Sequence, residues 1–336
     1  MRQYEFSVKE FTELLATSPG IEDLVDVDGT VAVVRLDDDA DVPVDHRLIE
    51  RVAVLPMVLV GVRAGADGTD PRAVPFAPYC DVIISEDPST LEPIIESVAI
   101  APRAATALAM LLRASEHRSI GDGLVAESAV YSMLQGGPEF AAWRRSRPVR
   151  QRFEAGPAVR ISRSGNTLEL VLDRPQVRNA LNVAMRDELY EALTMAAAEP
   201  DVHVHLRGEG ATFCAGGDLD EFGSFPDPAT AHLIRLARSI GHLIAGISER
   251  VTAHVHGACM GSGIELPAFA GRVVAREGAT FGLPEVRLGL IPGAGGTVSI
   301  TRRIGRHRTA YLALSAQQID AVLAYQWQLV DEIVSQ

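Results

Sequence analysis

Short apolar segments alternate with longer amphipathic ones along the second half of the chain. The short segments, rich in β-branched residues, predict strands at Leu168–Leu172, Val202–Arg207, Val251–His256 and Val273–Arg276. Longer segments with a helical spacing of apolar residues predict helices at Val183–Glu199, Ala231–Ile247 and Gly261–Ala270. This alternation favours an α/β fold in which helices cover sheets.

An arginine-rich segment from Trp143 to Arg160 lacks both patterns, and we interpret it as a connector between two units, residues 1–150 and 156–336. The first unit partly repeats the second. Residues 29–37 (GTVAVVRLD) resemble residues 165–173 (GNTLELVLD), and residues 80–119 align without gaps with residues 270–309. The two aligned segments lie further apart in the second unit than in the first. We therefore expect the first unit to be a smaller α/β domain, a degenerate copy that lacks part of what lies between the two aligned segments of the second unit.

Composition and charge narrow the classes of function. Apolar residues make up 47% of the chain but aromatic residues only 5%, so the core must be aliphatic. The formal net charge of −13 argues against general binding of nucleic acid and against attraction to an anionic membrane surface. An anionic small molecule would need a local group of basic residues.

The cysteines and the N-terminus bear on the compartment. Cys80, Cys214 and Cys259 are isolated and form no CxxC pair, which is typical of a reducing environment. The first residues resemble no signal peptide, and no run approaches the roughly 18 apolar residues of a membrane span. We expect a soluble, cytoplasmic protein.

Three glycine-rich segments could carry chemistry. Residues 213–219 (FCAGGDL) follow a predicted strand, and their small side chains leave backbone N–H groups accessible. Residues 257–265 (GACMGSGIE) lead from a strand into a helix start, where unpaired N–H donors suit an oxyanion, close to Glu265. Residues 281–285 (FGLPE) place Glu285 before a Gly/Pro-rich loop. Taken singly, each segment also fits a plain turn, a packing contact or a surface carboxylate.

Taken together, and with residues 178–182 (RNALN), these segments resemble the crotonase (enoyl-CoA hydratase/isomerase) superfamily from about Asn166 to Val334. The spacing between Glu265 and Glu285 matches that between the two catalytic glutamates of its hydratases. The resemblance implies a crotonase-like spiral of repeated ββα units. It also implies an acyl-CoA substrate, no separate cofactor and a homo-oligomer, either a trimer or a hexamer.

The resemblance assigns roles residue by residue. The N–H groups of Gly217 and Ser262 would hold the thioester oxygen, Glu285 would protonate C2, and Glu265 would hold and deprotonate the attacking water. The expected activity is that of an enoyl-CoA hydratase, a lyase of acyl-CoA and fatty acid metabolism. The implied contacts to coenzyme A are Arg174, Arg178, Ala180, Ala215 and Asp218. Arg302 and Arg303 are weaker candidates, and Asp218 also suits a hydrogen bond within its loop.

Other features limit or qualify these assignments. His254 and His256 alternate on a predicted strand, but they have no third ligand nearby and we expect no metal site. Ser262 stands where the family mostly has glycine. The sequence after Ile333 lacks the family's C-terminal helices, and we expect the first unit to replace them. That unit should be catalytically silent, because Ile95 falls opposite Glu285.

Two alternatives to the hydratase stay open. One is an enoyl-CoA double-bond isomerase, in which one glutamate shuttles a proton between carbons. The other is a non-catalytic or partner-dependent acyl-CoA-binding subunit, which has no chemical need for both glutamates. Products separate the first alternative from hydration, since only hydration yields a 3-hydroxyacyl-CoA. The acyl chain cannot be inferred from the sequence.

Overall fold

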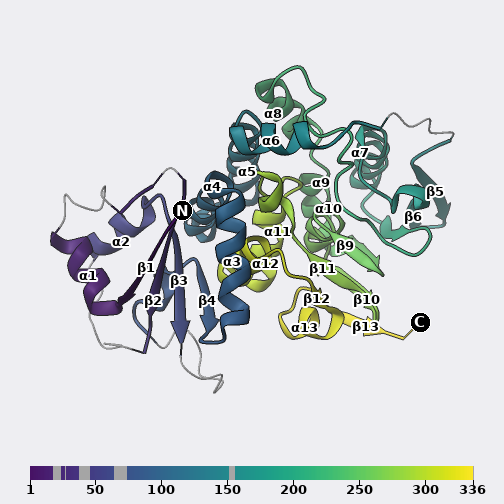
Figure 1. Ribbon diagram of the computed structural model, residues 1–336. Coiled ribbons are helices and arrows are strands. Elements are labelled where there is room, and N and C mark those ends of the chain that lie inside the picture. The colour runs from purple at the N-terminus through teal and green to yellow at the C-terminus, as the bar shows by residue number, and fades with distance from the viewer. Residues whose placement is uncertain (18–23, 27, 38–45, 64–73, 151–155, 336) are drawn as a thin grey trace.

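The computed structural model describes residues 1–17, 24–26, 28–37, 46–63, 74–150 and 156–335. A four-stranded parallel sheet lies at one end of the molecule, and several helices separate it from the larger second half (Figure 1). The strands of this first sheet are β1 (Arg2–Ser7), β2 (Thr30–Arg35), β3 (Val58–Arg63) and β4 (Val82–Ser85). The helices before residue 150 are α1 (Val8–Thr17), α2 (His46–Ala53), α3 (Pro88–Ile100), α4 (Pro102–Arg113), α5 (Ile120–Gln135) and α6 (Pro138–Ser146).

The second half contains a six-stranded sheet in the order β13-β10-β8-β7-β6-β5. Its strands are β5 (Val159–Ser164), β6 (Thr167–Leu172), β7 (His203–Gly208), β8 (Val251–Val255), β10 (Arg272–Arg276) and β13 (Glu332–Val334). Only β5 pairs antiparallel with its neighbour. A smaller sheet joins β9 (Ala258–Met260), β11 (Thr280–Gly282) and β12 (Ile319–Asp320). The helices are α7 (Val183–Ala198), α8 (Pro228–Ala237), α9 (Ile240–Gly246), α10 (Ser262–Glu265), α11 (Gly296–Ile304), α12 (Arg306–Ser315) and α13 (Ala321–Gln326).

The first sheet is buried on both faces at its centre. In β2, Val31 and Val33 belong to the large core of the molecule, whereas Ala32 and Val34 face a smaller core with Phe11 of α1. Successive side chains of a strand point to opposite faces, so the unbroken apolar run of β2 is what a doubly covered parallel strand requires. The prediction of an α/β fold is confirmed.

Two predicted helices differ from the observed ones. The helix expected over Ala231–Ile247 is divided into α8 and α9, because Ser239 caps a new helix by accepting the N–H of His242 at 3.2 Å. The helix expected over Gly261–Ala270 is a single α-turn, α10, followed by a 3₁₀ turn that begins at Pro267. Proline has no N–H to continue the α-helical pattern.

The boundary expected near residue 150 does not separate two cores. Leu124, Tyr131 and Phe140 of α5 and α6 belong to the same apolar core as residues of every major strand in the second half. Trp143, which we assigned to the connector, is helical in α6 and stacks on Phe140. Helix α5 lies against α8 and α11, so the first unit packs into the second.

The two aligned segments share a structural detail. Arg113, at the end of α4, and Arg303, near the end of α11, each bind backbone carbonyls and one aspartate: Asp81 for Arg113 and Asp331 for Arg303. Each aspartate accepts the N–H of a strand residue, Leu59 in β3 and Val273 in β10. The alignment does not hold throughout, since Ile95 lies in the long helix α3 whereas Glu285 begins a short 3₁₀ helix.

Of the helices described, none alone has the length and apolar character to cross a membrane. Only α3 and α4 together, bent by 115°, reach that length and composition.

Candidate active site

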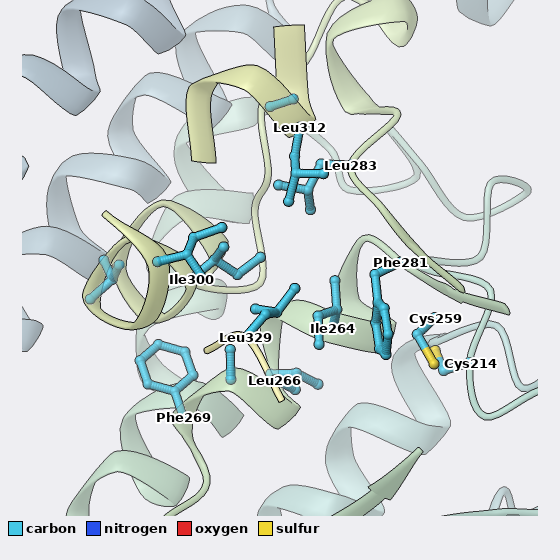
Figure 2. Close-up of a cluster of buried hydrophobic side chains, with 14 of the residues drawn as sticks. Cys214, Cys259, Ile264, Leu266, Phe269, Phe281, Leu283, Ile300, Leu312 and Leu329 are labelled. Atoms are coloured by element: carbon cyan, nitrogen blue, oxygen red, sulfur yellow. The ribbon is translucent and has the colours of Figure 1, made fainter. Parts of the chain in front are cut away.

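Glu265 ends the one-turn helix α10, which follows strand β9. The neighbouring side chains Ile264 and Leu266 point into an apolar cluster with Phe281 and Ile300 (Figure 2). Glu265 is only 2% exposed, and its Oε2 accepts the backbone N–H groups of Ala294 and Gly296, both at 2.8 Å. These two donors fix the carboxylate at the N-terminal end of α11 and favour its ionised form.

Glu285 lies directly opposite, at the start of the 3₁₀ helix Glu285–Leu288 that follows β11. Its side chain is 8% exposed, and its Oε2 is buried without a hydrogen-bond partner among the described residues. A buried polar atom without a partner usually has a functional explanation or an unobserved ligand or water.

The two carboxylates converge above Gly261. A Cβ placed on Gly261 would lie 2.2 Å from Glu285 Oε1 and 3.7 Å from Glu265 Oε1. Gly261 also has φ +49°, a conformation that residues with a Cβ rarely adopt. Glycine is therefore required here for two reasons, and the contact shows that the glutamates share one small space.

Burial controls the proton affinity of this pair. It raises the pKa of Glu285 to about 8, and the negative charge of Glu127 adds to the rise. Burial also raises the pKa of Glu265 well above its ordinary value, with further contributions from the charges of Glu285 and Glu127. Glu265 accepts two amide N–H groups from the loop that leads into α11, whereas Glu285, among the described residues, accepts only its own backbone N–H. We therefore assign the negative charge to Glu265 and the proton to Glu285.

Gly217 and Ser262 contribute two amide groups to the same space. Asp218 N donates to Leu181 O at 2.8 Å, and Gly261 N donates to Gly282 O at 3.0 Å. The Gly217 and Ser262 amides themselves donate to no acceptor in the described part of the chain. A cavity of about 170 Å³ is lined by both of these residues and by both glutamates.

A third glutamate, Glu127 of α5, comes from the first half of the chain. Its Oε1 accepts the N–H of Gly295 at 2.7 Å, and its Oε2 accepts the N–H and the hydroxyl of Thr297 at 2.9 and 2.7 Å. Four consecutive amides at the start of α11 therefore alternate between two carboxylates: Ala294 and Gly296 bind Glu265, and Gly295 and Thr297 bind Glu127. Burial raises the pKa of Glu127 to about 7.

Sequence reasoning missed Glu127 and two further residues of α5, Tyr131 and Gln135, which line the cavity. It also missed Arg235 of α8, whose guanidinium carbon lies 4.4 Å from the centre of the Tyr131 ring. Helical periodicity places Glu127 and Tyr131 on one face of α5. No local pattern indicated that this face meets the loop before α11, which lies in the other half of the chain.

The expected coenzyme A contacts divide into two groups. Arg178, Ala180 and Ala215 lie on two adjoining loops at the protein surface, where Ala215 N donates to Arg178 O at 2.9 Å. Arg174 is buried, 3% exposed, and pairs with Asp218 at 3.0 Å while also donating to Ala180 O. The expectation that Arg174 contacts a coenzyme A phosphate is therefore corrected: its side chain binds Asp218 and Ala180 O in the interior and supports these loops. Asp218 also lines the cavity that contains the two glutamates, and its contact with coenzyme A stays a prediction.

The remaining candidates have structural partners. Arg303 binds Ala268 O, Ala270 O and Asp331, and Arg302 donates to Arg118 O. His254 approaches the ring of His205 at 2.9 Å, whereas His256 lies beyond the end of β8 and contacts Gly210 O. Over the described ranges, no three His, Cys, Asp or Glu side chains are grouped so that they could hold a metal ion.

Comparison with known proteins identifies relatives of the second half. Residues 162–336 match the family model described as enoyl-CoA hydratase/isomerase. The chain is 36% identical to the 2,3-dehydroadipyl-CoA hydratase of Escherichia coli over 174 residues, which are 52% of this chain and 68% of the relative. It is also 36% identical over 174 residues to the mevalonyl-coenzyme A hydratase of Aspergillus fumigatus, covering 50% of this chain and 62% of that protein.

A solved structure shows the same fold. The enoyl-CoA hydratase from Thermoplasma volcanium is 36% identical, with a TM-score of 0.50, and the match covers 53% of this chain and 72% of that one. The match therefore spans about two thirds of the length of these relatives, and about half of this chain.

Proposed function

Because the chain belongs to the enoyl-CoA hydratase/isomerase family, we propose that it is a lyase that adds water across the 2,3-double bond of an acyl-coenzyme A thioester. The observation that carries this proposal is that two buried carboxylates meet above Gly261. The cavity there is also lined by Gly217 and Ser262, whose amides have no acceptor among the described residues. Two carboxyl groups of unequal proton affinity can act as a base and an acid on one water molecule.

The proposed mechanism uses groups already placed by the fold. The thioester oxygen accepts the N–H groups of Gly217 and Ser262, which stabilise the enolate formed when water attacks C3. Glu265, ionised, removes a proton from that water. Glu285, protonated, donates its proton to C2, so that the substrate gains one water molecule in total.

The test is to mix the intact chain with short and medium-chain 2-enoyl-CoA and follow the loss of the conjugated enoyl absorbance. We expect a product heavier by one water. Turnover without a change of mass would instead indicate double-bond isomerisation. Binding of acyl-CoA without turnover would contradict the hydratase proposal.

We propose that the first half is a degenerate copy of the second and is catalytically silent by itself. The similar arrangements around Arg113 and Arg303 support the duplication. We further propose that α5 completes the acyl-CoA cavity, since Tyr131 and Gln135 line it. This role corresponds to that of the C-terminal helices in the family.

The assembly and the ligands follow from the same proposal. We propose an acyl-CoA substrate, no separate cofactor, cytoplasmic location, and a trimer or hexamer as the family resemblance implies. Light scattering of the purified chain measures the mass of the assembly directly. The mass of a monomer would contradict the proposed trimer or hexamer.

Replacing Gly261 with alanine should lower kcat for hydration by roughly 100-fold, because displacing a catalytic group by about 1 Å has effects of this size. The new methyl group would collide with Glu285 Oε1, and φ +49° adds backbone strain. Gly278→Ala is a suitable control, since a Cβ there meets nothing within 4 Å. Equal activity of the Gly261 variant and the control would show that catalysis does not require the present positions of the two carboxylates.

Replacing Glu127 with glutamine should shift the alkaline limb of the kcat/KM profile to lower pH, because the charge of Glu127 raises the pKa values of both Glu265 and Glu285. At pH 6 we expect activity within about tenfold of the wild type, because an amide oxygen can still accept one of the loop hydrogen bonds. Glu188→Gln is the matched control: Glu188 also accepts two backbone N–H groups, those of Ala158 and Val159, but at the start of β5. The same shift in both variants would contradict the assignment.

A further inference from the structure

Arg235 of α8 lies where two cavities adjoin. The first is the cavity that contains the two catalytic glutamates, and the second, also about 170 Å³, lies between α5, α8 and α9. The cavities share the residues Leu181, Arg186, Phe225, Arg235, Gly293 and Ala294. Arg235 therefore borders both the space that contains the two glutamates and the neighbouring cavity.

Neutral groups hold the guanidinium of Arg235 in place. Its Nη1 donates to the hydroxyl oxygens of Ser128 and Ser132 at 2.8 and 3.1 Å, and its Nη2 donates to Gln135 Oε1 at 3.2 Å. The Tyr131 ring lies beneath it. The Nε–H group, by contrast, donates to no acceptor within the described ranges. The guanidinium therefore has a fixed orientation and can still donate a hydrogen bond to a ligand.

The other arginines of the second cavity are paired with acids. Arg186 binds Asp187 at 2.8 Å, and Arg238 lies 3.5 Å from Asp187 and 3.8 Å from Glu191. Arg235 forms no ion pair with any carboxylate that the structure describes.

Among the described carboxylates, Glu127 is the one whose charge acts on Arg235, and it raises the pKa of Arg235. The oxygens of Glu127 are already bound to Gly295 and Thr297, and burial raises its pKa to about 7, so its charge is partial near neutral pH. Arg235 is itself largely removed from water, which lowers its pKa. A cation in such a position is stabilised strongly by an anion that enters the cavity.

We propose that Arg235 binds a carboxylate at the far end of the acyl chain, so that the preferred substrates are coenzyme A thioesters of dicarboxylic 2-enoic acids. This inference rests on the proposed function, which places the thioester at Gly217 and Ser262. A guanidinium matches a carboxylate with two parallel N–H donors, which gives orientation as well as attraction. The net charge of −13 means that an anionic acyl end depends on such a local partner.

The phosphates of coenzyme A are the other source of anion for Arg235, and a pair of matched substrates distinguishes the two. We would compare a six-carbon 2-enoyl-CoA with its counterpart that carries a terminal carboxylate. The wild type should favour the carboxylated substrate at least about tenfold in kcat/KM. Arg235→Gln should lower kcat/KM for the carboxylated substrate on the order of 30- to 100-fold, and for the neutral one less than about threefold.

Two further variants separate charge from structure. Arg235→Lys keeps the positive charge but loses the two parallel N–H donors of the guanidinium. This variant should retain part of the preference for the carboxylated substrate. Arg238→Gln removes a paired arginine of the same cavity and should leave the preference unchanged. Equal losses for both substrates in Arg235→Gln would overturn the proposal, because they would indicate a phosphate contact or a role in folding.

Binding measurements keep this inference separate from the hydratase proposal. Calorimetry with the saturated six-carbon monocarboxylic and dicarboxylic thioesters gives Kd values that need no turnover. A wild-type preference for the dicarboxylic thioester, lost in Arg235→Gln, would support the inference even if hydration were not observed. Absence of any preference in the wild type would overturn it, whatever the activity.

Discussion

Replacing Glu285 with glutamine is expected to lower kcat for hydration by about 10²–10⁴-fold, which is the usual contribution of a general acid. The amide keeps the shape of the side chain but cannot donate a proton to C2. The buried Oε2 of Glu285, which has no hydrogen-bond partner in the described part of the chain, points to a group kept available for reaction. The rate is measured from the loss of enoyl absorbance at pH 7.

The pH profile provides the independent check on this assignment. Burial raises the pKa of Glu285 to about 8, so the proton needed at C2 is present below that pH and lost above it. Wild-type kcat/KM should therefore fall as pH rises through about 8. Glu277→Gln, a change at an exposed position after β10, is the control. It should keep both the wild-type rate and the same decrease of kcat/KM at alkaline pH. A Glu285→Gln variant with an unchanged rate would remove Glu285 from the mechanism.

Replacing Arg113 with methionine is expected to destabilise the chain by about 3–5 kcal/mol, the usual cost of leaving one partner of a buried ion pair alone. The two side chains are 5% and 1% exposed, and Arg113 Nη2 lies 2.7 Å from Asp81 Oδ2. Arg113 also donates to the carbonyls of Val52, Leu55 and Met57, just before β3. The loss is measured as a lower urea midpoint of the intact chain.

Two controls separate burial from charge in this experiment. Arg163→Met removes an exposed partner of Glu199, where both side chains are nearly half exposed, and should leave the urea midpoint almost unchanged. The double variant Arg113→Met with Asp81→Leu should recover part of the stability, because no unpaired charge remains. Equal midpoints for Arg113→Met and Arg163→Met would contradict the assigned role of the buried pair.

Local sequence was sufficient where an element depends on its own residues. The strand at Leu168–Leu172 and the helix at Val183–Glu199 were predicted almost to their observed ends, because each has a clear period and a turn or cap at its ends. The break between α8 and α9 was missed because Ser239, an ordinary polar residue on a helical face, acts as a cap. Only the hydrogen bond from the N–H of His242 to Ser239, which the structure shows, indicates that two helices rather than one occupy this segment.

The site was predictable only as far as its motifs extend. The sequence predicted that Glu265 and Glu285 meet, and the structure places both carboxylates at Gly261; their catalytic roles stay a prediction. It gave no indication of Glu127 or Arg235, whose positions depend on how α5 and α8 pack. Arg174 was misjudged for a related reason: an arginine beside a motif is exposed or buried according to the position of its partner, here Asp218 on a separate loop.

The placement of α5 has a consequence for how the site forms at low protein concentration. The helix that supplies Glu127, Tyr131 and Gln135 is covalently joined to the loops that carry the other two glutamates. Bringing these groups together is therefore an intramolecular step, governed by the effective concentration that the connecting chain sets. Diluting the protein does not separate α5 from the site, so this part of the catalytic machinery does not depend on a second molecule being present.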